Sequence, residues 1–130
     1  MSKSSKQVDG IPENIWLLPA AEAELRRLDR NEQIRCGRAL VKVSESPSQF
    51  GSPLENRPGT QLAGFRKLKV GRLRIVYRVV ATDRIEVTVI VTVGRREGLE
   101  VYQTAHGRRE ALEQFVEEAL KKLVADTDKK

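Results

Sequence analysis

The chain has 130 residues, the length of one domain, and 39% of them are hydrophobic while 32% are charged. This balance is typical of a folded domain with a heavily charged surface, and it excludes a disordered or membrane-embedded chain. The net charge of +6 is uneven, because residues 57–109 alone carry twelve Lys and Arg against four Asp and Glu. A polyanion is the natural partner of such a local positive excess.

The cellular setting follows from two further features of the sequence. The longest apolar run, Val87–Val93, is broken by threonines and is far shorter than the roughly 20 residues of a membrane-spanning helix. The single cysteine, Cys36, has no partner for an internal disulfide, and the first ten residues lack the apolar core of a secretory signal. We therefore expect a cytoplasmic protein with no membrane association.

The first half of the chain predicts a strand and two helices. Ile15–Leu18 is a short apolar run suited to a strand, and Pro19 is well placed at the opening of a helix. Asn31 is a candidate N-cap for a second helix, which we expect to end before Pro47. The segment 46–64 is rich in proline and glycine and predicts a long surface loop, which is usually functional or mobile.

The last part of the chain predicts one long helix. Apolar residues recur at helical spacing from Leu112 to Leu123, which gives a helix over residues 110–125. Residues 1–14 are polar and are expected to be a flexible lead-in, while 126–130 read as a tail. The domain organisation is therefore a single domain over residues 15–125.

Between these helical parts, the stretch from Phe65 to Tyr102 reads as three consecutive strands. Successive side chains of a strand point to opposite faces, so residues of equal parity share a face. Two apolar rows follow, Leu73, Ile75, Tyr77 and Val79 on one run and Val87, Val89, Val91 and Val93 on the next. If these rows pack together, the other face gathers Lys67, Lys69, Arg72, Arg74, Arg78 and Arg96.

This order predicts an α+β fold. It consists of a short N-terminal strand, two helices, an antiparallel sheet of three further strands and a C-terminal helix. The valine-rich face is expected to pack on the first two helices, which leaves the cationic face for solvent and ligand.

Several kinds of catalytic site are excluded by inventory. His106 is the only histidine, no GxSxG motif accompanies it, and no Cys or His cluster has the spacing of a zinc site. Asp and Glu are nearly absent from the expected cationic face, which disfavours a two-metal nuclease, and no phosphate-binding glycine motif is present. We expect neither a metal nor a nucleotide cofactor.

The remaining inventory suits a phosphodiester. Lysine and arginine contact phosphates, and the ring of Tyr102 can stack on a base. Cleavage at a ribose 2′-hydroxyl would further need a base, cations for the developing charge and a donor for the leaving oxygen. A plain solvated surface or a nucleic-acid docking patch explains the same composition, and Tyr102 is equally well read as a packing residue at a strand end.

The residues that carry a family resemblance are FRKLKVGRLRIVYRV and VTVIVTVGRREGLEVY, with the helix pair ending in Glu45, Ser46 and Pro47. Over about residues 15–109 the chain resembles the RelE/ParE superfamily of type II toxins, and within it the RelE ribosome-dependent messenger-RNA endonucleases. The resemblance implies the RelE-like fold. The most specific part is VGRRE followed by EVY.

The resemblance also implies a set of site residues. The positions that match the catalytic cleft of RelE-like enzymes hold Lys67, Lys69, Arg74, Arg96 and Tyr102. By the resemblance, Lys69 is the base, Lys67 and Arg74 hold the scissile phosphate, Arg96 aids the leaving group and Tyr102 stacks on the nucleotide. Further RNA contacts are expected from Arg66, Arg72, Arg78 and Arg95.

The function that follows is a toxin that cleaves messenger RNA in the ribosomal A site without a metal, which inhibits translation. Its implied partners are the ribosome, messenger RNA and a cognate antitoxin in a hetero-oligomer. Two alternatives stay open: a ParE-like poison of DNA gyrase without nuclease chemistry, and a non-catalytic relative that binds RNA or the ribosome.

Overall fold

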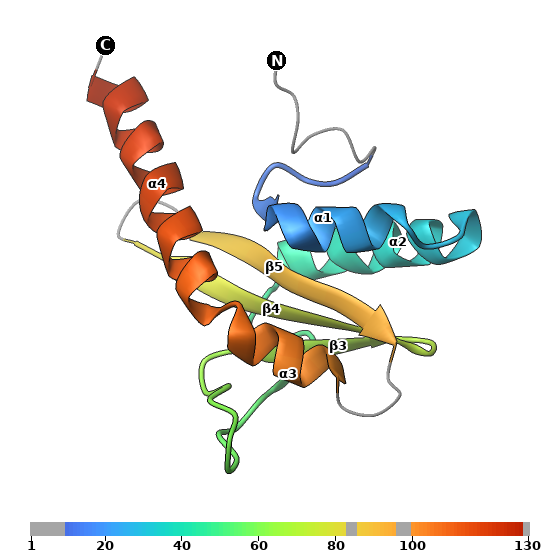
Figure 1. Ribbon diagram of the computed structural model, residues 1–130. Helices are drawn as coiled ribbons and strands as arrows, with labels where there is room; N and C mark the ends of the chain where they lie inside the picture. Colours follow the sequence, from blue (N-terminus) through green and yellow to red (C-terminus); the bar gives the residue numbers. More distant parts are fainter. Residues whose placement is uncertain (1–9, 83–85, 96–99, 129–130) are drawn as a thin grey trace.

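The computed structural model describes residues 10–82, 86–95 and 100–128, the last six for their backbone only (Figure 1). One five-stranded sheet, in the order β1-β5-β4-β3-β2, forms its centre. The strands are β1 (Ile15–Leu17), β2 (Ser52–Pro53), β3 (Arg66–Val70), β4 (Leu73–Ala81) and β5 (Glu86–Arg95). β1 is parallel to β5, and all other neighbours are antiparallel. The predicted α+β class and order of major elements are confirmed, with β2 as an additional short edge strand.

The helices begin where local chemistry favours a start. Pro19 is in the first turn of α1 (Pro19–Arg26), as predicted. α2 (Arg30–Glu45) begins with a capping box, in which Asp29 accepts from the Glu32 N–H at 2.8 Å and Glu32 accepts from the Asp29 N–H at 3.4 Å. The prediction of Asn31 as the N-cap was therefore wrong by two residues.

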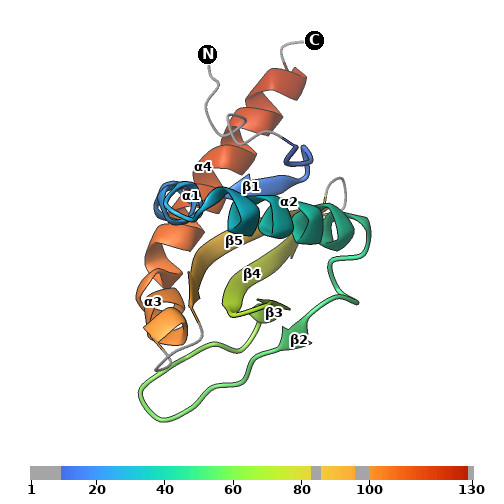
Figure 2. The same ribbon diagram turned by 90° about the vertical axis from the view of Figure 1, so that its right-hand side faces the viewer.

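The sheet is covered by helices on both faces, which the sequence interpretation did not anticipate. Two neighbouring residues of β5 show this, because successive positions of a strand face opposite sides of the sheet. Arg95 forms an ion pair with Glu32 of α2, whereas Gly94 lies against Val101 of α3 (Glu100–Gly107). Figures 1 and 2 show α1 and α2 on one side of the sheet and α3 on the other. The face predicted to be open to solvent is therefore partly covered.

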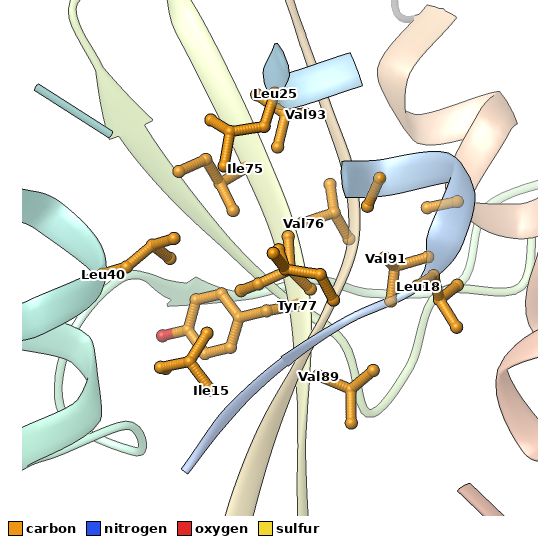
Figure 3. Packing of buried hydrophobic residues seen from close by; sticks show 14 of the residues in the cluster. Ile15, Leu18, Leu25, Leu40, Ile75, Val76, Tyr77, Val89, Val91 and Val93 are labelled. Atoms are coloured by element: carbon orange, nitrogen blue, oxygen red, sulfur yellow. The ribbon is translucent and has the colours of Figure 1, made fainter. Parts of the chain in front are cut away.

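The hydrophobic core extends over both faces of the sheet, with α1 and α2 on one face and Val101, Ala105 and Leu112 of α3 and the C-terminal helix on the other (Figure 3). Tyr77 is fully buried, as its parity predicted, and its hydroxyl donates to the carbonyls of Pro47 at 3.0 Å and Phe50 at 2.6 Å. These bonds satisfy the polar tip of a core aromatic residue. They also fix the segment after α2 against the edge of the sheet. Cys36 is buried in α2 as a free thiol.

The predicted row of four valines on β5 is wrong because the strand contains a bulge. Val93 is paired with Ile75, but Ile90 is paired with Tyr77, so two steps along β4 correspond to three along β5. The extra residue reverses the alternation. Val89 consequently lies opposite Arg78, on the other face of the sheet from Val93.

The C-terminal helix α4 (Arg109–Asp128) is longer at both ends than the predicted range 110–125. Leu112 is buried, and Phe115 makes an edge-to-face contact with Trp16 of β1, with ring centroids 6.3 Å apart. The first half of α4 therefore packs on the domain, while its last turns project beyond the sheet (Figure 1). Within the described residues, no helix is long and apolar enough to span a membrane.

Candidate functional site

The β3–β4 hairpin presents two lysines on one face. Lys67 and Lys69 are two residues apart on β3, and Lys69 is paired directly with Arg74 of β4. The hairpin turns at Gly71, whose φ of 60° is a conformation that a residue with a Cβ rarely adopts. A short turn and a strict register thus place three cationic side chains together, on the face that strand parity predicted.

These three residues line a cleft of about 670 Å³. The hairpin forms its floor, the loop between β2 and β3 forms one wall and α3 forms the other. The lining residues are Pro53, Leu54, Glu55, Arg57, Pro58, Thr60, Leu62, Lys67, Lys69, Arg74, Tyr102 and Gln103. Four of them are cationic and one is acidic, which leaves a net charge of +3. A small anionic group is the ligand that such a cleft favours.

Tyr102 reaches the cleft from α3 rather than from a strand end, which corrects the sequence interpretation. It is half-buried, and the Nζ atom of Lys67 lies 6.0 Å from the centroid of its ring. That separation is at the limit of a cation–π contact. The structure therefore brings together four of the five predicted catalytic residues, namely Lys67, Lys69, Arg74 and Tyr102. The fifth, Arg96, lies outside the described residues.

Arg74 is far less exposed than a cation on an open sheet face would be. Its exposed fraction is 7%, and its Nη1 atom donates to the carbonyls of Gly71 at 3.0 Å and Leu73 at 2.9 Å. These bonds fix the plane of the guanidinium group. Its Nε and Nη2 atoms have no hydrogen-bond partner among the described residues, so they are available to an anion in the cleft.

The loop wall of the cleft is held in place by side chains that the sequence interpretation did not single out. Asn56 Oδ1 accepts from the N–H groups of Leu62 at 2.7 Å and Ala63 at 2.9 Å. The N–H of Gln61 donates to Nδ1 of His106 at 2.8 Å, and Arg109 donates to the side-chain oxygen of Gln61 at 2.7 Å. The loop is thereby fastened to the end of α3 and the start of α4.

α3 is anchored to the rest of the fold by a charge network at its C-terminal end. Arg108 donates through Nη2 to Glu24 Oε2 at 2.8 Å, and through Nη1 to Glu24 Oε1 at 3.0 Å and the Val91 carbonyl at 2.8 Å. Glu24 also accepts from the Thr92 hydroxyl and the Val93 N–H. Burial alone would raise the pKa of Glu24, but these hydrogen bonds and the charge of Arg108 outweigh it and lower that pKa. The carboxylate stays ionised and joins α1, β5 and α3.

The four additional arginines expected to contact RNA do not line the cleft. Arg66 donates to the carbonyls of Phe50 and Gly51, and Arg95 is paired with Glu32 on the α2 side of the sheet. Arg78 lies over the ring of Phe65, 5.6 Å from its centroid. Arg72 is exposed in the hairpin turn. These four arginines therefore lie outside the cleft, and their contacts with RNA stay a prediction.

Other cleft residues were missed by sequence reasoning, above all Arg57, Glu55 and Gln103. Gln103 follows Tyr102 directly, and Arg57 is the only cation between Phe50 and Phe65. The length of the loop was a signal of function, but it did not indicate which of its residues face inward. Among the described residues, no group of three or more His, Cys, Asp or Glu side chains could hold a metal ion. The chemistry available in the cleft is therefore that of cations, an aromatic ring and amides.

The mixed sheet and its helices have the fold of the RelE/ParE superfamily of toxins. The chain belongs to the family described as ParE toxin of type II toxin-antitoxin systems, whose sequence model matches residues 15–99.

The solved structures that are similar to the chain include two of toxins. A mutant of the E. coli toxin RelE in the free state is 29% identical with a TM-score of 0.59, over 73% of this chain and 95% of that chain. The toxin-antitoxin complex RelBE2 from Mycobacterium tuberculosis contains a chain that is 27% identical with a TM-score of 0.48, over 66% of this chain and 100% of that chain. A search of curated protein sequences gave no significant match.

Proposed function

We propose that this toxin is a metal-independent endoribonuclease that cleaves messenger RNA on the ribosome. The observation that carries the proposal is the convergence of Lys67, Lys69, Arg74 and Tyr102 on one cleft with a net positive lining. The likeness to the E. coli toxin RelE, at 29% identity over most of both chains, supports a RelE-type reaction. The cleft contains the cations and the aromatic ring that the reaction requires.

In the proposed mechanism, Lys69 is the general base and accepts the proton of the ribose 2′-hydroxyl. The 2′-oxygen then attacks phosphorus, and the bond from phosphorus to the 5′-oxygen breaks. Lys67 and the free N–H groups of Arg74 stabilise the charge on the phosphoryl oxygens. Arg96 aids the departing 5′-oxygen, as a donor or as a positive charge; where it acts only as a charge, the 5′-oxygen takes its proton from solvent, and Lys69 releases the proton that it accepted to solvent. The products are a 2′,3′-cyclic phosphate and a 5′-hydroxyl, and no water is consumed.

Tyr102 has a separate role in this mechanism. Its ring comes from α3, across the cleft from the two lysines of β3. A nucleotide base stacked on that ring would place its own phosphate toward the hairpin. Stacking on an aromatic ring is worth about 1–3 kcal/mol per base and tolerates any base, so it orients the nucleotide without selecting it.

Membership of a toxin family from type II systems also supports a protein antitoxin as the partner that silences this chain. We propose a hetero-oligomer of toxin and antitoxin, formed in the cytoplasm where the ribosome is also present. An acidic segment of the antitoxin would complement the basic cleft, and occupation of the cleft would exclude messenger RNA.

A second candidate function follows from the family match itself. The matching model describes ParE toxins, so a poison of DNA gyrase that acts by binding is the alternative to a nuclease. The same cations would then contact DNA or an acidic protein surface, and the toxin itself would cleave no phosphodiester bond. A gyrase supercoiling assay separates the two functions, since a ribosome-directed nuclease leaves supercoiling unchanged.

The deciding experiment is the mapping of cleavage sites on messenger RNA in translating ribosomes. Native protein should cut within the codon in the A site, and Lys69→Ala and Arg96→Ala should each reduce cleavage by at least about 100-fold. Arg95→Ala is the matched control, because it removes the adjacent cation, whose side chain is paired with Glu32 instead. Intact messenger RNA with the native protein, together with loss of gyrase supercoiling, would refute the nuclease.

A further inference from the structure

His106 joins the two walls of the cleft. It is four residues after Tyr102 on α3, so the two side chains lie on the same side of that helix. Its Nδ1 atom accepts a hydrogen bond of 2.8 Å from the N–H of Gln61 in the loop wall, 45 residues away in the sequence. The proposed function gives Tyr102 a role, but it gives none to His106.

The bonded residue follows directly on a part of the loop that lines the cleft. Arg57 and Thr60 exchange two backbone hydrogen bonds, of 2.8 and 2.9 Å, and so close a tight turn immediately before Gln61. Both residues line the cleft. A shift of Gln61 therefore moves one cation and one hydroxyl group of the cleft lining, while the β3–β4 hairpin keeps its own pairing.

The direction of the bond defines the protonation state of the ring. A backbone N–H can only donate, so Nδ1 of His106 carries a lone pair and the proton of the ring is on Nε2. In a protonated imidazole both nitrogens carry a hydrogen, and neither can accept. The bond to Gln61 therefore exists only with the neutral ring. Histidine is the side chain whose charge ordinarily changes between pH 5 and pH 8.

Charged groups lie on both elements that meet at His106. In the loop wall and at the adjoining helix ends they are Glu55, Arg57, Arg108, Arg109 and Glu110. Arg109 donates to the side-chain oxygen of Gln61 at 2.7 Å and to the His106 carbonyl at 2.9 Å. A positive ring would repel this guanidinium group, which weakens the second tie to the loop as well. Glu110 is exposed and forms no ion pair within the described part of the chain, so it offsets little of that repulsion.

We propose that His106 is a positioning residue, whose neutral ring holds the loop wall against α3 and whose protonation releases that wall. The cleft is then closed on its loop side near neutral pH and open in mild acid. Its cationic floor is the same in both states, because the register of β3 and β4 does not depend on the loop. The effect of the opening on RNA cleavage rests on the proposed function, but the opening itself does not.

NMR spectroscopy of the full-length protein, without RNA or ribosomes, tests the release of the wall. At pH 8 the His106 ring should be the tautomer with its proton on Nε2. The protection of the Gln61 N–H against exchange, relative to the intrinsic rate at each pH, should fall at least about five-fold from pH 8 to pH 5. The amide signals of Arg57 and Thr60 should shift together with the titration of the ring.

Two variants separate the loss of the acceptor from other effects of pH. His106→Asn keeps an acceptor oxygen but does not titrate, so the protection of Gln61 should be the same at both pH values. His106→Lys has no acceptor and is charged at both pH values, so the protection should be low at both. His106 is only half-buried, and unchanged amide signals of β4 will show that each variant is folded.

Three results would overturn the proposal. A proton on Nδ1 at pH 8 would show that the ring does not accept from Gln61. Equal protection of the native protein at the two pH values would show that protonation does not release the loop. An equal fall in His106→Asn would assign the change to another group, such as Glu55 or Glu110. A chain that cleaves no messenger RNA would leave all of these measurements valid.

Discussion

Replacing Arg108 by alanine tests whether the network at the end of α3 holds the cleft wall to the sheet. The variant removes three hydrogen bonds of 2.8–3.0 Å, two to Glu24 and one to the Val91 carbonyl. It leaves a carboxylate that is 21% exposed without its cation. Loss of a hydrogen bond to a charged group costs about 1.5–3 kcal/mol, and a fully buried unpaired charge costs more.

Because both side chains retain about a fifth of their exposure, water partly replaces the lost contacts. We therefore expect Arg108→Ala to lower the free energy of unfolding by about 2 kcal/mol, which is a fall in Tm of about 8 °C for a chain of this size. Urea titration and thermal melting followed by circular dichroism measure both quantities. Lys121→Ala is the control, since it breaks a 3.7 Å ion pair whose side chains are 74% and 67% exposed. Its expected effect is below about 0.5 kcal/mol.

The same variant has a predicted pH dependence. The pKa of Glu24 is lowered in the folded state, so its contribution is present above the usual value of 4.5 and is lost as the pH falls through the lowered pKa. Arg108 provides part of that lowering. The difference in stability between native protein and Arg108→Ala should therefore be largest near neutral pH and should narrow below pH 4.5. A difference that stays constant with pH, or one no larger than that of Lys121→Ala, would refute the reasoning.

Three further predictions concern the core and its turns. Burial raises the pKa of the Cys36 thiol to about 11, so Ellman's reagent at pH 8 should react about 100-fold more slowly with native than with urea-unfolded protein; equal rates would contradict this. Gly51→Ala should destabilise by more than about 3 kcal/mol, because the new methyl group meets the Lys67 carbonyl, whereas Gly59→Ala, with a similar positive φ and open space, should cost about 1 kcal/mol in the same urea titration. Tyr77→Phe removes a hydroxyl that bonds two carbonyls and should lower the free energy of unfolding by about 1–2 kcal/mol in the same titration. An unchanged free energy of unfolding would show that water replaces the hydroxyl as the partner of these carbonyls.

Strand parity was enough to place Lys67, Lys69 and Arg74 on one face, because a hairpin with a two-residue turn leaves no freedom of register. The same rule failed on β5, since the bulge opposite Val76 and Tyr77 reverses the alternation. Nothing in a run of valines and threonines marks such a position. Strand parity predicts which face a side chain lies on only where the pairing of the two strands has no bulge.

The burial of Arg74 and the position of Tyr102 depended on contacts between distant segments. Arg74 is enclosed because α3 lies over its end of the sheet, and α3 has only eight residues with few apolar side chains to reveal it. Because the residues before α3 have the composition of a strand, the segment Glu100-Val101-Tyr102 was interpreted as the end of that strand. His106 and Gln61 are 45 residues apart and meet only in the folded chain. Local patterns could not reveal either relation.

The cleft has parts of unequal rigidity. Its cations stand on the β3–β4 hairpin, whose register is tied to the core through Tyr77 and Ile75, while its walls are a loop and a short helix held by side-chain bonds. Substitutions between Leu54 and Leu62 can therefore reshape the space around a bound group without disturbing the sheet. The cationic floor and the walls of the cleft can thus change independently in evolution, so that one fold can accommodate different bound groups with little loss of stability.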